Sequence, residues 1–231
     1  ARTLSTAAAQ KLASLALTEP QVEVRSQMAS SAKRLAVREA FPILRNLLTH
    51  DQDTKDIYVP LLLWWAIEAK AETDRDAVAE FFQDAGLWNV PLVQEHLLER
   101  VMRRYALAGT RKDLLACARL LRLSPGPAPT ARLMAGFEEA FKGRSLAALP
   151  EELVEALAQR GGGSLALGVR LGRADAVEKA LHAIANDSTK RDDRLQLIQV
   201  FGEVKQPAGV PVLLQLLKAS IDSSFRKAAL T

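Results

Sequence analysis

The sequence predicts an all-α fold in which short helices stack into an α-solenoid. The chain of 231 residues is 48% hydrophobic, and only 5% of its residues are aromatic. Leucine and alanine dominate, and both lose little conformational freedom on entering a helix. Apolar residues recur at helical spacing along almost the whole chain, and no segment shows the alternation of a strand. A similar motif recurs at the start of several helices, which indicates a structural repeat.

The apolar periodicity predicts many short helices separated by polar, glycine-containing or proline-containing breaks. The helical pattern continues to the end of the sequence, so we expect a single repeat domain over 1–231, excised from a longer chain. We expect helices near residues 3–17, 21–36, 42–49, 58–71, 75–83, 91–108, 111–123, 129–142, 150–159, 164–172, 174–186, 191–203, 207–219 and from 224 onward.

Residues at the expected helix ends support these boundaries. Thr110 and Asp113 resemble a capping box with aspartate in place of the usual glutamate, and Gly109 is expected to end the preceding helix. The segment SPGPAP at 124–129 predicts a loop and a possible bend, because proline interrupts a helix. The segment RGGG at 160–163 predicts a flexible loop.

The stretch YVPLLLWWAIEAK, residues 58–70, contains two adjacent tryptophans. Its apolar run is much shorter than the roughly 20 residues that a membrane-spanning helix needs. The helix is apolar on every side, which is typical of a helix inside a protein. We therefore expect Trp64 and Trp65 to pack in the core, with an exposed platform for a ligand as the alternative.

Four segments share the pattern apolar, proline, apolar, apolar. They are FPIL at 41–44, VPLL at 59–62, VPLV at 90–93 and VPVL at 210–213. Proline fits the first turn of a helix because its missing N–H would have no partner there. The pattern therefore predicts that a helix begins at each of these four sites.

A longer match extends the repeat, since residues 211–226 run parallel to residues 42–60. Arginine also recurs at the helix entries, as Arg25, Arg194 and Arg226. This pattern resembles HEAT repeats, a family in which each unit is a helical hairpin. One hairpin cannot bury its apolar stripe alone, so hairpins stack on each other. The resemblance implies a right-handed superhelix of about six to seven hairpins.

Part of the chain resembles a narrower family as well. Residues 56–71, 87–110 and 113–121 are similar to the helical segment of multidomain bacterial proteins from planctomycetes and their relatives. Those are membrane-bound dehydrogenase-like proteins with a β-propeller, HEAT-like repeats and a c-type haem domain. This chain has no C-x-x-C-H motif for haem attachment. The resemblance therefore implies a helical spacer with no haem-binding residue of its own, in an exported or periplasmic protein.

The sequence offers little support for catalytic or metal chemistry. His50, His96 and His182 lack the spacing of zinc ligands. The single cysteine, Cys117, lies on an apolar helix, so we expect a small core residue and not a reactive thiol. We expect no catalytic residue, no metal and no cofactor in this chain, and no enzymatic activity.

Two glycine-containing segments have structural interpretations. GGGSLA at 161–166 fits part of a dinucleotide-binding motif, but no strand precedes it, so a flexible loop is favoured. GVRLG at 168–172 is expected to let two helices approach each other closely.

The net charge of +4 permits a nucleic acid or an anionic surface as a partner without requiring one. The strongest basic cluster contains Arg100, Arg103, Arg104 and Tyr105. On one helix face these side chains could contact phosphate. The alternative is a solvated face in which Glu99 is the local partner of the arginines.

These observations favour a non-catalytic scaffold or spacer that binds a protein partner or flanking domains, within a larger dehydrogenase-like haem protein. A stand-alone protein-binding module is the first alternative. A HEAT-like DNA glycosylase, in which Trp64 and Glu68 form part of the site, is the second, although nucleic acid is not the expected partner. The candidate interaction residues are Trp64, Trp65, Trp88, Arg100, Arg103, Arg104 and Tyr105.

Overall fold

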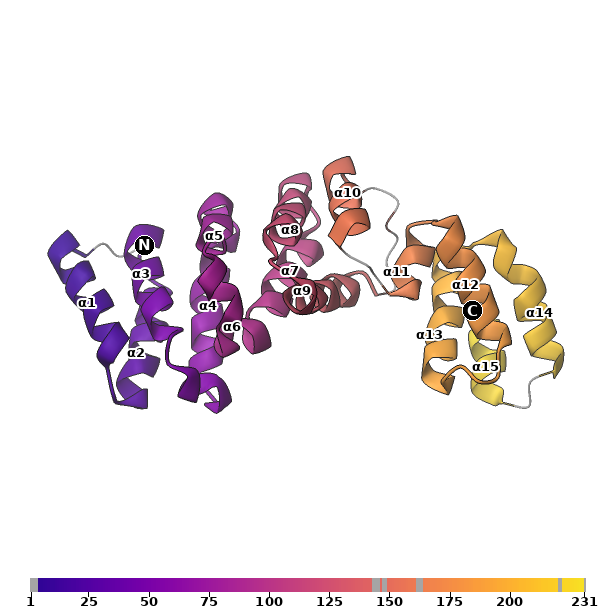
Figure 1. Cartoon of the computed structure of the whole chain (residues 1–231), viewed down its shortest axis with the longest axis horizontal. Helices are drawn as coiled ribbons and strands as arrows, with labels where there is room; N and C mark the ends of the chain where they lie inside the picture. The colour runs from indigo at the N-terminus through magenta and orange to yellow at the C-terminus, as the bar shows by residue number, and fades with distance from the viewer. Residues whose placement is uncertain (1–3, 143–145, 147–148, 161–163, 220–221, 231) are drawn as a thin grey trace. The chain divides into compact units, whose positions relative to one another are not determined.

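The computed structural model of the chain describes residues 4–142, 146, 149–160, 164–219 and 222–230, and these residues contain helices and no strand. They cluster into two compact units, which are described separately. Unit 1 contains helices α1 to α10, and unit 2 contains helices α11 to α15. Both units are drawn in Figure 1.

Unit 1 is built from two layers of helices. One layer contains α2, α4, α7 and α9, the other contains α1, α3, α5, α8 and α10, and helices pack on their neighbours within a layer as well as across layers. Figure 1 shows α5, α8 and α10 in a row above α4, α7 and α9. The elements are α1 (Thr6–Thr18), α2 (Val22–Ala32), α3 (Val37–Leu47), η1 (Asp51–Lys55), α4 (Val59–Ala71), α5 (Arg75–Phe81), η2 (Ala85–Asn89), α6 (Pro91–His96), α7 (Leu98–Ala108), α8 (Arg111–Leu123), α9 (Pro127–Ala140) and α10 (Glu151–Arg160).

Unit 2 shows the same alternation. Helices α11, α13 and α15 pack in one layer, and α12 packs on α14 in the other. Its core contains Val177, Ile184, Ile198, Phe201 and Phe225. The predicted all-α class is therefore confirmed, and the pairwise packing of neighbouring helices is compatible with an α-solenoid. The elements are α11 (Leu165–Arg170), α12 (Ala174–Ala185), α13 (Arg191–Val204), η3 (Pro207–Gly209), α14 (Val210–Ala219) and α15 (Ser223–Ala228).

One of the four proline motifs was assigned wrongly as a helix start. Pro42 lies inside α3, which begins five residues earlier at Val37. The motif predicted the start correctly at Pro60 and Pro91, which occupy the first turns of α4 and α6. The proline rule failed at α3 because a helix can contain a proline after its first turn at the cost of one backbone hydrogen bond.

Two predicted boundaries also need correction. The region 91–108 is two helices, because the chain breaks its regular helical pattern at Leu97 between α6 and α7. The predicted loop at 124–129 is shorter than expected, since α9 already begins at Pro127. Proline is favoured in the first turn, so Pro127 starts the helix and does not prevent it. Residues 161–163 of the second predicted loop lie outside the described residues.

The helix ends around Gly109 follow the sequence prediction. Gly109 ends α7 in the left-handed region with φ 65°, a conformation that glycine adopts without strain. The next residue begins the capping of α8, because the hydroxyl of Thr110 accepts a hydrogen bond from the backbone N–H of Asp113 at 3.3 Å.

Polar side chains connect successive segments of unit 1 by bonding to carbonyl groups at or just beyond helix ends. The ammonium group of Lys70, at the end of α4, donates to the carbonyls of Lys33 and Leu35 beyond the end of α2, at 2.8 and 2.7 Å. His50 Nε2 donates to the carbonyl of Ala16 near the end of α1 at 2.8 Å. Carbonyl groups at helix ends lack a donor within the helix, so a side chain from a later segment of the chain supplies one.

Arg25 is the most connected of these side chains. Its guanidinium donates to the carbonyls of Glu19 and Pro20 at 2.9 and 2.8 Å, and it forms a bidentate ion pair with Asp53. Both charged side chains are buried. The pair therefore joins α2 to the segment that leads into α4, which fixes the spacing of successive hairpins.

The repeated arginines of the sequence do not all occupy equivalent positions. Arg194 of unit 2 is buried and donates to the carbonyl of Ile184 at 3.0 Å and to Asp187 at 2.8 Å, which resembles the bonding of Arg25. Arg226 is exposed, and its neighbour Phe225 is buried in its place. The periodicity of arginine therefore holds for Arg25 and Arg194 and fails for Arg226.

Two glycines permit close contact between helices. A Cβ atom at Gly136 of α9 would lie 2.1 Å from the carbonyl oxygen of Glu99 on α7. In unit 2, a Cβ atom at Gly168 would lie 2.4 Å from the Cβ atom of Ala176 on α12. The second contact confirms the prediction that residues 168–172 let two helices approach closely.

We predict that Gly136→Ala destabilises the protein by about 1–3 kcal/mol, because the added methyl group overlaps a backbone oxygen that cannot move aside. Gly126→Ala is the matched control, since a Cβ atom there meets no atom within 4 Å. Urea denaturation followed by circular dichroism measures both free energies of unfolding. Equal stability of the two variants would contradict the close contact of α7 and α9.

We predict that Lys70→Met lowers the free energy of unfolding by about 1–3 kcal/mol, because it leaves two carbonyl groups without their donor. Lys112→Met is the control, since Lys112 is an exposed residue of α8. The same denaturation experiment tests both variants. A Lys70→Met protein as stable as the control would show that the two hydrogen bonds add nothing to the packing of α2 on α4.

Candidate interaction surface

The outward side of α4 carries an exposed stripe of large apolar side chains. Tyr58, Leu61, Leu62 and Trp65 are spaced as i, i+3, i+4 and i+7, which places them on one side of the helix. Tyr58 is 66% exposed and Trp65 is 41% exposed, while the two leucines are half-buried. A surface helix usually turns such a stripe toward the core, so this one is available to another molecule.

The two adjacent tryptophans have different environments. Trp64 is only 7% exposed and packs in the core, as expected. The prediction that Trp65 is also buried is wrong, because consecutive residues point about 100° apart around a helix and α4 is covered on one side only. The ammonium group of Lys33 lies 5.6 Å from the centroid of the Trp65 ring, within the range of a cation–π contact.

Two other candidate residues belong to the core. The Trp88 indole is buried, and its N–H donates to the carbonyl of Phe82 at 2.8 Å. Tyr105 is also buried, and burial raises the pKa of its hydroxyl well above the ordinary value. With Trp64, these residues are removed from the candidate surface, because a partner cannot reach them.

The three candidate arginines lie on α7, next to α4. Arg103 is exposed and has no ion-pair partner within the described part of the chain. Arg104 lies near two carboxylates of α4, 3.9 Å from Glu68 and 4.0 Å from Glu72. The sequence suggested Glu99 as the local partner of the arginines, but the carboxylates near Arg104 are those of Glu68 and Glu72. Arg100 is half-buried, and its Nη1 atom has no hydrogen-bond partner among the described residues.

The outward residues of α7 have the same spacing as those of α4, and the two helices pack against each other. They place an apolar stripe and a basic stripe side by side. Sequence reasoning missed Tyr58, although its position seven residues before Trp65 was a usable signal. We name the α4–α7 face by its eight residues, Tyr58, Leu61, Leu62, Trp65, Arg100, Arg103, Arg104 and Leu107.

Four arginines of the other layer of unit 1 pair with carboxylates of neighbouring elements. These contacts join α3 to the residues after α5, α5 to α8, and α8 to α10. The pairs are Arg45 with Asp84, Arg119 with Asp76 at 3.3 Å, Arg111 with Glu152 at 3.0 Å and Arg122 with Glu155 at 3.8 Å. The α4–α7 face differs, because two of its three arginines have no such partner in the described residues.

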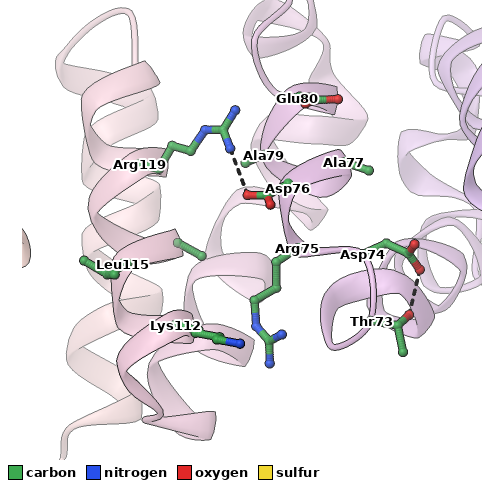
Figure 2. Close-up of a pocket in the computed structure, with 11 residues that line it drawn as sticks. Thr73, Asp74, Arg75, Asp76, Ala77, Ala79, Glu80, Lys112, Leu115 and Arg119 are labelled. Carbon is green, nitrogen blue, oxygen red and sulfur yellow. Dashed lines mark hydrogen bonds and ion pairs between the residues drawn. The ribbon is translucent and has the colours of Figure 1, made fainter.

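A cleft of roughly 700 Å³ lies between α5 and α8 in the same layer as these pairs. Figure 2 shows Arg119 reaching across the cleft to Asp76, and Thr73 bonded to Asp74. Arg75 donates to Asp113 of α8 at 2.5 Å. Arg75, Asp76 and Arg119 of this cleft already have charged partners, so the cleft carries a weaker indication of a ligand than the α4–α7 face.

The Arg75–Asp113 contact is partly buried and electrostatically strong. Burial alone would raise the pKa of Asp113, but hydrogen bonds from Arg75 and Thr110 lower it below its ordinary value. The carboxylate therefore stays charged and holds α5 against α8. This is a structural function, because both partners are used in joining two helices.

The arrangement of Trp64 and Glu68 does not form an open site. The Trp64 ring is buried, so no base could stack on it, and Glu68 lies beside Arg104. His50 and His96 bond to the carbonyls of Ala16 and Thr54. Within the described ranges, no three His, Cys, Asp or Glu side chains are close enough to hold a metal ion.

None of the helices in the described part of the chain has the length and apolar character required to cross a membrane. Comparisons with protein-family models, curated proteins and solved structures find no match to this chain.

We predict that Cys117 is unreactive in the folded protein. Its thiol is fully buried in α8, and burial raises the pKa of the thiol well above the ordinary value. Ellman's reagent at about pH 8 should release no colour from the native protein and one equivalent in concentrated urea. Rapid reaction of the native protein would contradict the buried position and make Cys117 a candidate functional thiol.

Proposed function

We propose that this chain is a non-catalytic helical-repeat scaffold of the HEAT type that binds a protein partner or a neighbouring domain. The observation that carries the proposal is the α4–α7 face, where an exposed tryptophan of α4 is accompanied on the adjoining α7 by Arg100 and Arg103, which have no ion-pair partner among the described residues. Tryptophan and arginine are the residues that most often dominate the energy of protein interfaces. The alternating helix layers support a stacked-hairpin scaffold beneath that face.

The proposal includes a larger parent protein. The resemblance of residues 56–121 to dehydrogenase-like proteins with c-type haem domains suggests that the repeats hold neighbouring domains in fixed positions. In that arrangement the redox chemistry belongs to the flanking domains, and this chain supplies distance and orientation. A stand-alone protein-binding module is the alternative, and the size of the native chain distinguishes the two.

We predict that the native protein, captured from source-cell extract with an antibody against this chain, is large and stains for haem. Its mass would be measured intact and compared with the 25.2 kDa of this sequence. A haem-free native chain near that mass would overturn the dehydrogenase-like context and leave the stand-alone binding module.

The same preparation tests the nucleic-acid alternative. A DNA-binding solenoid would bind a DNA duplex with an affinity that falls steeply as salt increases, because binding releases counterions from the phosphates. We expect no such binding. Tight, salt-sensitive binding to the duplex would replace the protein-binding proposal with a nucleic-acid function.

A further inference from the structure

We propose that the α4–α7 face binds an acidic amphipathic segment of a partner protein. This inference deepens the proposed protein-binding function and rests on it. It follows from three properties of the face, which are the spacing of its exposed apolar side chains, the basic groups beside them and the placement of the acidic residues.

The apolar stripe requires an apolar side on the partner. Tyr58 and Trp65 are largely exposed, and Leu61 and Leu62 lie between them at half-burial. Ile57, which precedes them, is 81% exposed. Covering these side chains removes apolar area from water, and a helix with apolar residues at i, i+3, i+4 and i+7 matches a stripe with the same spacing.

The neighbouring basic stripe requires acidic groups on the partner's flank. Arg103 is exposed and has no ion-pair partner among the described residues, whereas the unpaired Nη1 atom of Arg100 is buried and cannot be reached by a partner. On the other side of α4, Lys33 lies over the ring of Trp65. Carboxylates placed over Arg103 and Lys33 would form charge-assisted hydrogen bonds with them, while a basic segment would be repelled.

The placement of the acidic residues favours a protein over a nucleic acid. Glu68 and Glu72 lie on the same side of α4, beside Arg104. Phosphates following a regular backbone would meet these carboxylates, whereas a peptide can place its carboxylates over Arg103 and its apolar residues over α4. Arg104 is already near Glu68 and Glu72, so we assign it the function of joining α4 to α7.

The experiment uses a fluorescein-labelled synthetic peptide of about 20 residues, with leucines at helical spacing and glutamates at the flanking positions. A second peptide carries lysine in place of every glutamate. Fluorescence anisotropy at low and high salt measures binding of each peptide to the full chain. We expect binding of the acidic peptide, weakening with salt, and at least about tenfold weaker binding of the basic peptide.

Two variants locate the binding site. Trp65→Ala removes the exposed ring, and Arg103→Glu reverses a charge that has no ion-pair partner in the described residues. Each should weaken binding of the acidic peptide by about tenfold. Lys112→Glu makes the same type of charge reversal at an exposed position of α8, away from the α4–α7 face, and should change binding of the acidic peptide by about twofold at most. Trp65, Arg103 and Lys112 are all exposed, and unchanged far-ultraviolet circular dichroism would show that the three variants fold.

The outcomes have separate meanings. Equal binding of the acidic and basic peptides would overturn the charge assignment, and so would tighter binding of a DNA duplex than of the acidic peptide. Binding that survives both Trp65→Ala and Arg103→Glu would show that the peptide docks elsewhere, which also overturns the inference. The mass and haem content of the native chain do not depend on these results, so failure of this inference is distinguishable from failure of the proposed function.

Discussion

The bonding of helix-end carbonyls by side chains from the neighbouring helix is the constraint on which the packing of unit 1 depends. A helix ends with carbonyl groups that have no partner within the helix, and leaving them buried without a donor is costly. Lys70 and His50 supply donors to the ends of α2 and α1, and Arg25 bonds to the chain before its own helix as well as to Asp53. Each contact has directional geometry, so it sets the position of one helix on the next where apolar contact alone would let them slide.

The outer surfaces of the two layers differ in how many of their arginines form ion pairs between neighbouring helices. In the layer of α3, α5, α8 and α10, arginines pair with carboxylates across successive helices, and one such pair, Arg119 with Asp76, lies in the cleft between α5 and α8. On the α4–α7 face, Arg104 has this function, while Arg100 and Arg103 do not. Arg103 is exposed on α7, the helix that packs against α4, so its guanidinium is available for recognition of a partner.

Close helix contact complements this polar bonding. Gly136 brings α9 against the backbone of α7, and this contact anchors the inner side of the helix that carries the candidate arginines. A rigid support is important for recognition, because an interface held in one conformation loses less entropy on binding. The α4–α7 face is therefore presented by two well-packed helices, and not by a loop.

The sequence by itself determined the helical class, most helix boundaries and the capping at Gly109 and Thr110, because these depend on local backbone preferences and apolar spacing. It did not determine which side of α4 is covered. Trp64 and Trp65 are adjacent residues of the same type, yet Trp64 is buried and Trp65 is exposed. It likewise gave no means to distinguish Arg104, which lies near Glu68, from Arg103 one residue earlier. Only the tertiary structure decided these points, because burial and ion pairing are set by the helices that pack alongside and not by the order of residues within one helix.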